Sequence, residues 1–308
     1  MQPAIDRRDF LKTVAATAMA ATSSRPAANA RMFVSLNGSL TNKKVEWPEF
    51  ARLAARLGYG GVDVNLDAAR NEGLDATRAL FTELKITPTI ANLPFRFGGD
   101  EAAYQEGLKQ LDEAAGFAAG IGCRRMMAVL PPASETPKAD FRKIITQRLL
   151  AIAEILHKSQ VRLGLEFLGP VHFRTRLPHE FIWRMGEALQ LARECGTNVG
   201  LVLDAWHWHH AGATAADIEA AGASRIVHIH VSDAKAQPAE DVRDNQRLMP
   251  GEGVIDLMTF FRTLARIGYE GGVSPEPIGR VPPEMSGEDG ARLGLETTLK
   301  VMKKAGVA

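Results

Sequence analysis

Residues 199–204 read Val-Gly-Leu-Val-Leu-Asp, and residues 226–230 read Ile-Val-His-Ile-His. Each stretch is a short, mostly apolar run that ends in a carboxylate or an imidazole. Runs of this length, rich in Val, Ile and Leu, are typical of strands buried on both faces of a parallel sheet. The two stretches therefore predict parallel strands whose polar ends lie at the same edge of the sheet.

The same kind of run recurs along the chain and alternates with longer amphipathic stretches that predict helices. Eight repeats in about 280 residues match an eight-stranded (β/α)8 TIM barrel, which typically takes about 250 residues. An open doubly wound sheet is the alternative, but no G-x-G-x-x-G follows the first run. We expect one α/β barrel domain over residues 31–308. The predicted strands are Met32–Leu36, Gly61–Leu66, Ile86–Leu93, Arg125–Leu130, Val161–Leu168, Val199–Ala205, Ile226–Ser232 and Gly271–Pro275.

Residues 1–30 have the pattern of an export signal rather than of a folded element. Arg7 and Arg8 precede Phe-Leu-Lys, a weakly apolar stretch follows, and Ala28-Asn29-Ala30 resembles a cleavage site. Paired arginines in this setting resemble a twin-arginine signal, which predicts the twin-arginine export machinery as a partner and a periplasmic location. The alternative is an ordinary chain terminus with arginines placed by chance.

Composition excludes several classes of function. The chain of 308 residues has 37 Lys and Arg against 36 Asp and Glu, which gives no basic excess for nucleic-acid binding. It contains no apolar run of about 18 residues, so we expect no membrane anchor. Cys123 and Cys195 each lie beside a glycine and predict buried thiols rather than a disulfide framework.

The ends of the last four predicted strands carry Glu166, Asp204, His230 and Glu276. Active-site residues of such barrels lie at these carboxyl ends, and the alternation along a strand turns all four side chains into the barrel mouth. Three carboxylates and an imidazole converging there are costly unless a cation lies among them. We therefore expect one divalent metal ion. Oxygen-rich ligands suit Mn, Mg or Co, and Zn is also compatible.

These residues resemble the xylose isomerase-like TIM barrel superfamily. The resemblance rests on Leu165-Glu166, Leu203-Asp204 with His207 three positions on, His228-Ile229-His230, Pro250-Gly251-Glu252-Gly253 and Pro275-Glu276-Pro277. Members include ketose 3-epimerases, isomerases and dehydratases of inositol catabolism, and endonuclease IV. The resemblance implies that the metal ligands are the four residues above and that Glu166 and Glu276 act as catalytic base and acid.

Four further residues are predicted to bind substrate. The resemblance implies that His207 contacts it and makes Arg247 the nearest candidate for an arginine that follows the seventh strand. Trp206 is predicted to cover the apolar side of a sugar ring, with packing at the barrel rim as the alternative. His172 lies near a strand end and is a candidate contact for a hydroxyl group.

The resemblance implies a metal-dependent sugar isomerase or epimerase, which removes the proton next to a carbonyl and passes through a metal-stabilised enediolate. The partner is then a small carbohydrate, and a homo-oligomer is compatible because relatives are often dimers or tetramers. Export favours an alternative, a lyase that eliminates the aglycone from 3-keto-glycosides. A non-catalytic sugar-binding barrel is a further alternative. A nuclease of the endonuclease IV type is disfavoured because every histidine lies at position 157 or later.

Overall fold

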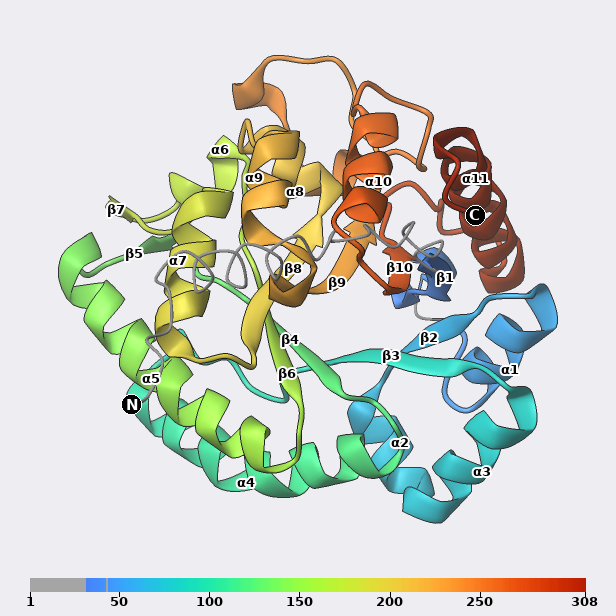
Figure 1. Cartoon of the computed structure of the whole chain (residues 1–308), viewed down its shortest axis with the longest axis horizontal. Coiled ribbons are helices and arrows are strands. Elements are labelled where there is room, and N and C mark those ends of the chain that lie inside the picture. Colours follow the sequence, from blue (N-terminus) through green and yellow to red (C-terminus); the bar gives the residue numbers. More distant parts are fainter. Residues whose placement is uncertain (1–31, 43) are drawn as a thin grey trace, which may run out of the picture.

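A computed structural model describes residues 32–42 and 44–308, so the predicted export signal lies outside the described residues. Eight parallel strands form a closed barrel in the order β1-β10-β9-β8-β6-β4-β3-β2, and helices surround it (Figure 1). The barrel strands are β1 (Met32–Leu36), β2 (Gly61–Val64), β3 (Thr87–Asn92), β4 (Arg125–Val129), β6 (Arg162–Glu166), β8 (Val199–Asp204), β9 (Ile226–Val231) and β10 (Gly271–Pro275).

Helices follow the barrel strands and pack around them. They are α1 (Glu49–Leu57), α2 (Leu66–Glu72), α3 (Leu74–Leu84), α4 (Glu101–Gly120), α5 (Lys138–Lys158), α6 (Val171–Arg174), α7 (Met185–Cys195), α8 (Ala205–His210), α9 (Ala215–Ala221), α10 (Leu257–Arg266) and α11 (Gly287–Ala305). Short 3-10 turns are η1 (Gly38–Thr41), η2 (Ala223–Arg225), η3 (Ala239–Asp241) and η4 (Asp244–Gln246).

The main core lies between the strands and the helices. In α10, Phe260, Phe261 and Leu264 are fully buried, because apolar residues three and four positions apart share one helix face. Asp256 caps the start of this helix by accepting a hydrogen bond from the Thr259 backbone N–H at 2.9 Å. Burial of one face and the Asp256 cap thus fix α10 against the barrel.

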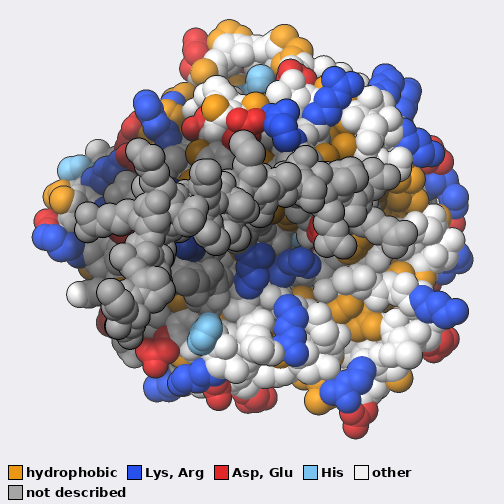
Figure 2. Space-filling view, in the orientation of Figure 1, with side chains coloured by type: hydrophobic (Ala, Val, Ile, Leu, Met, Phe, Trp, Pro, Cys, Tyr) orange, Lys and Arg blue, Asp and Glu red, His pale blue; other side chains and the backbone are white. Residues whose placement is uncertain are grey.

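The predicted barrel, its single domain and all eight strands are confirmed, with no strand end shifted by more than two residues. One pairing was not predicted: β5 (Ala133–Ser134) and β7 (His179–Glu180) form a small antiparallel sheet outside the barrel. Cys123 and Cys195 are buried free thiols, as expected. Figure 2 shows acidic and basic side chains interspersed around one face, consistent with the near-zero net charge.

Within residues 32–42 and 44–308, no helix is both long and apolar enough to cross a bilayer.

Candidate metal centre and active site

The register between neighbouring barrel strands places their polar ends next to one another. Asp204 at the end of β8 pairs with His230 of β9, and His230 pairs with Ser274 of β10. Glu166 ends β6 and pairs with Val202, two residues before Asp204. Because parallel strands end at the same edge, these side chains meet at the barrel mouth.

Glu166, Asp204, His230 and Glu276 form one cluster, with one potential ligand atom of each lying within 4.8 Å of the others. Bonds of about 2.0–2.2 Å to a shared ion allow ligand atoms to lie up to about twice that distance apart. Three carboxylates and one imidazole in this arrangement are a chemically suitable set for a divalent cation. The residues present therefore fit the predicted metal.

His230 makes the shortest contacts within this cluster. Its Nδ1 lies 2.9 Å from Glu166 Oε1 and 3.6 Å from Glu276 Oε2. Burial opposes a charge on this ring, but the carboxylates of Glu276 and Glu166 outweigh it and raise the pKa of His230 to about 10. The nitrogen that faces the carboxylates thus carries a proton in the absence of metal, and a cation has to replace that proton.

Arg247 bridges two of the four predicted ligands. Its Nη1 donates to Asp204 Oδ2 at 2.7 Å and to Glu276 Oε2 at 3.0 Å. Its Nε and Nη2 both donate to Asp244 Oδ1, at 2.9 and 2.7 Å, and its guanidinium lies 4.6 Å from the centre of the Trp206 ring. The buried guanidinium therefore has contacts on three sides and is held in one position.

The segment that carries Arg247 is fixed by a second buried carboxylate. Asp233 pairs with Leu248 in an isolated bridge, and its side chain accepts from the backbone N–H of Gly251 at 3.0 Å and of Ile255 at 2.9 Å. A Cβ at Gly253 would lie 2.2 Å from the Ala234 carbonyl oxygen, so only glycine fits there. The Pro-Gly-Glu-Gly motif thus forms the tight turn after Arg247.

The predicted substrate-binding residues differ in their contacts with the cluster. His207 reaches the cluster, with Nε2 3.3 Å from Arg247 Nη2 and 3.8 Å from Asp204 Oδ2. Burial lowers the pKa of His207 to about 4, so the ring is neutral at pH 7. Trp206 is buried and its ring faces Arg247. His172 is half-buried, and its ring centre lies 4.1 Å from that of Phe173, which in turn lies 6.0 Å from that of His207.

The pKa values of Asp204 and Glu276 are shifted in opposite directions. Burial raises the pKa of both carboxyls, but at Asp204 the combined effect of Arg247, His207, His230 and the Trp206 N–H outweighs it and lowers that pKa to about 2. At Glu276 burial dominates and raises the pKa to about 7. Asp204 is thus a fixed anion, whereas Glu276 can gain or lose a proton near neutral pH.

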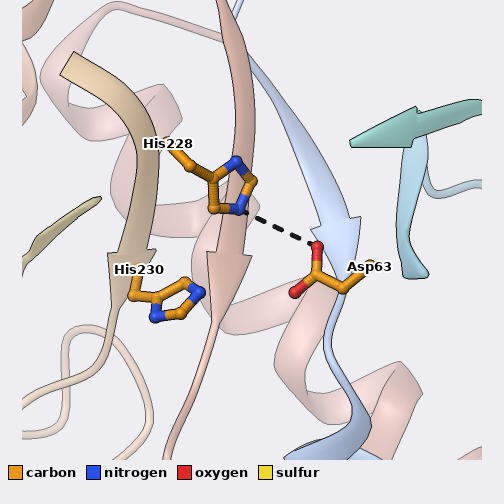
Figure 3. A group of neighbouring side chains, drawn as sticks. All are labelled: Asp63, His228 and His230. Carbon is orange, nitrogen blue, oxygen red and sulfur yellow. Dashed lines mark ion pairs between the residues drawn. The ribbon is translucent and has the colours of Figure 1, made fainter. Parts of the chain in front are cut away.

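Two groups at the site were missed by sequence reasoning. Asp244 holds Arg247, and the only sequence signal was their spacing of three residues. Asp63 in β2 lies on the other side of His230, together with His228 (Figure 3). His228 belongs to β9, two residues before His230. It is buried, with Nε2 2.7 Å from Ser274 Oγ, and burial lowers its pKa well below the ordinary value.

Comparisons with known proteins find relatives by sequence and by fold. An inosose isomerase from Halalkalibacterium halodurans is 28% identical over 76% of this chain and 82% of its own. The Bacillus subtilis inosose isomerase is 26% identical over 71% and 77%. A xylose isomerase domain protein from Alicyclobacillus acidocaldarius superposes with a TM-score of 0.82 at 28% identity, covering 90% of this chain and all of that one.

A structure described as IOLI protein with a binding zinc atom superposes with a TM-score of 0.76 at 24% identity, covering 89% and 99% of the two chains. At that identity the likeness shows the fold alone. The family model described as xylose isomerase-like TIM barrel matches residues 51–304. This chain therefore belongs to the xylose isomerase-like TIM barrel family.

Proposed function

We propose that the protein is a divalent-metal-dependent isomerase or epimerase of a polyhydroxylated ketone. The observation that carries this proposal is the convergence of Glu166, Asp204, His230 and Glu276 within 4.8 Å at the barrel mouth. Two of these residues are glutamates from different strands, which suits the removal and return of a proton at a carbon next to a carbonyl.

The substrate class is supported by the curated relatives. Those we compared are named inosose isomerases, and an inosose is a ring that carries a ketone and several hydroxyl groups. Keto sugars present the same pattern of a carbonyl beside a hydroxyl-bearing carbon. We therefore propose that the substrate is an inosose or a keto sugar.

The residues of the site have different proposed roles. Glu166, Asp204, His230 and Glu276 would hold the cation, which as a Lewis acid supplies stabilisation of negative charge at the substrate carbonyl. Glu166 removes the proton from the carbon next to the carbonyl. Glu276, which follows a different strand, donates a proton in the return step. Arg247 and the neutral His207 are placed beside them as hydrogen-bonding partners for sugar oxygens.

We also propose that the protein is exported in its folded state to the periplasm by the twin-arginine pathway. The support is the order of paired arginines, weakly apolar stretch and Ala-x-Ala in residues 1–30. Replacing Arg7 and Arg8 with Lys should retain the protein in the cytoplasm, as seen by cell fractionation. Continued appearance of the double variant in the periplasm would contradict this route.

Solvent exchange tests the proposed reaction. The metal-loaded protein is incubated in D2O with a panel of inososes, keto sugars and 3-keto-glycosides, and products are followed by NMR and mass spectrometry. Deuterium incorporation next to the carbonyl, with an epimer or isomer as product, is expected. Release of an aglycone from 3-keto-glycosides would instead identify a lyase. Absence of exchange with every member of the panel would contradict the proposed reaction.

A further inference from the structure

Two buried nitrogens below the metal-binding cluster have no hydrogen-bond partner among the described residues. They are Nε2 of His230 and Nδ1 of His228. Buried polar atoms in native proteins nearly always have a partner, either a protein group or an ordered water. His230 Nε2 is the more informative of the two, because a metal-binding histidine almost always donates its other N–H to a carboxylate, a carbonyl or a water.

The carboxylate on that side of the ring belongs to Asp63. One Asp63 oxygen and one nitrogen each of His228 and His230 lie within 4.8 Å of one another. Figure 3 shows that the His230 ring nitrogen farther from the backbone points towards Asp63, while the other nitrogen points away. A gap too long for a direct hydrogen bond but below 5 Å is spanned by one water that makes two bonds of about 2.8 Å.

Asp63 is clamped by polar groups from other parts of the barrel. Its Oδ1 lies 2.7 Å from the hydroxyl of Ser274, 2.8 Å from that of Thr89 and 2.9 Å from that of Ser35. Its Oδ2 accepts from Asn37 Nδ2 at 2.9 Å. These partners come from β10, β3, β1 and the residue after β1. The carboxylate therefore has a fixed position. The proposed acid–base roles of Glu166 and Glu276 do not explain why Asp63 has so many hydrogen-bond partners.

His228 belongs to the same network. A carboxylate only accepts hydrogen bonds, so the Ser274 hydroxyl donates its proton to Asp63. Ser274 Oγ must then accept from Nε2–H of His228, 2.7 Å away. His228 thereby fills the space beside His230 in a single orientation, with the two ring centres 5.5 Å apart.

We propose that Asp63 is a positioning residue for the metal ligand His230. Asp63 accepts the Nε2–H of His230 through one ordered water and so holds the ring with Nδ1 directed at the carboxylates of the metal site. The inference rests on the proposed function only in taking His230 as a metal ligand. Asp63 itself touches neither the cation nor the substrate.

Metal affinity of Asp63→Asn tests this role. Zn2+ is titrated against a competing chelator, and the variant should bind about 10- to 100-fold more weakly than wild type, the range for loss of such a partner. Tyr269→Phe is the matched control, because it removes a buried hydroxyl whose one hydrogen bond within the described residues is to the Gly272 carbonyl, at 2.9 Å. It should alter stability and leave the Zn2+ affinity within twofold. Equal affinity in wild type and Asp63→Asn would overturn the inference.

NMR tests the same role by a readout other than metal affinity. With Zn2+ bound, the Nε2–H of His230 should give a resonance protected from solvent exchange, and Asp63→Asn should lose it. A wild-type His230 whose Nε2–H exchanges freely would overturn the inference. If wild type binds no Zn2+, Mn2+ or Co2+ at all, the proposed function fails. If wild type binds and Asp63→Asn binds equally well, only the role of Asp63 fails.

Discussion

The two halves of the barrel mouth carry different chemistry. Strands β6, β8, β9 and β10 carry, at or just after their ends, the carboxylates and imidazole of the candidate metal cluster. Strands β1 to β3 contribute hydroxyls and amides, together with Asp63, which lies on the other side of His230. One half thus provides the charged ligands, and the other provides a hydrogen-bonded support beneath them.

The largest expected effect comes from removing the proposed base in the charged half. Glu166→Gln keeps the side-chain shape but cannot accept a proton, so turnover should fall by about 10³-fold or more while the circular dichroism spectrum is unchanged. Glu154→Gln, an exposed position on α5, is the control and should keep wild-type turnover. Turnover of Glu166→Gln within tenfold of wild type would remove Glu166 from the mechanism.

A substitution in the charged half should weaken metal binding more than a substitution in the other half. Asp204→Asn removes a carboxylate ligand and should weaken binding of Mn2+ or Zn2+ by about 100-fold or more. Asn65→Ala changes a residue at the end of β2, whose side chain caps α2 by accepting from the Ala68 N–H. Calorimetric titration should show wild-type affinity for this variant. Similar losses in both variants would mean that the two halves are not distinct.

Arg247 bridges Asp204 and Glu276 within the charged half and should stabilise the metal-free protein. Arg247→Met leaves Asp204 and Glu276 buried without their partner, which should lower the free energy of unfolding by about 3 kcal/mol. Bound metal should reduce this loss because the cation then neutralises both carboxylates. Urea unfolding with and without metal measures the difference, with Arg280→Met as a surface control. A loss that metal does not change would contradict this role.

A smaller, graded effect is expected from pH. Because the raised pKa of His230, about 10, means that metal binding displaces a proton, affinity should fall about tenfold for each unit of pH lost between pH 9 and 7. Below pH 7 the fall should steepen, since Glu276 also takes up a proton. Metal titrations across this range measure the slope. A flat profile would show that His230 is not a ligand.

The same contrast explains what could be predicted from sequence. The barrel followed from eight apolar runs, and the metal cluster followed from charged residues that end four of them. Asp63 lies inside the short run Gly-Val-Asp-Val, and its partners Ser35, Thr89 and Ser274 come from three other strands. Hydroxyl groups in apolar runs carry no sequence signal of what they bond. Such a network becomes visible only when barrel closure brings the strands together.

The most direct test of the account is the metal content of the purified protein after reconstitution and removal of excess ions. Elemental analysis should find one divalent ion per chain in wild type and less than a tenth of that in the double variant Glu166→Gln, Asp204→Asn. Wild-type protein without stoichiometric metal, or a double variant that retains it, would contradict a cation held by the last four strands.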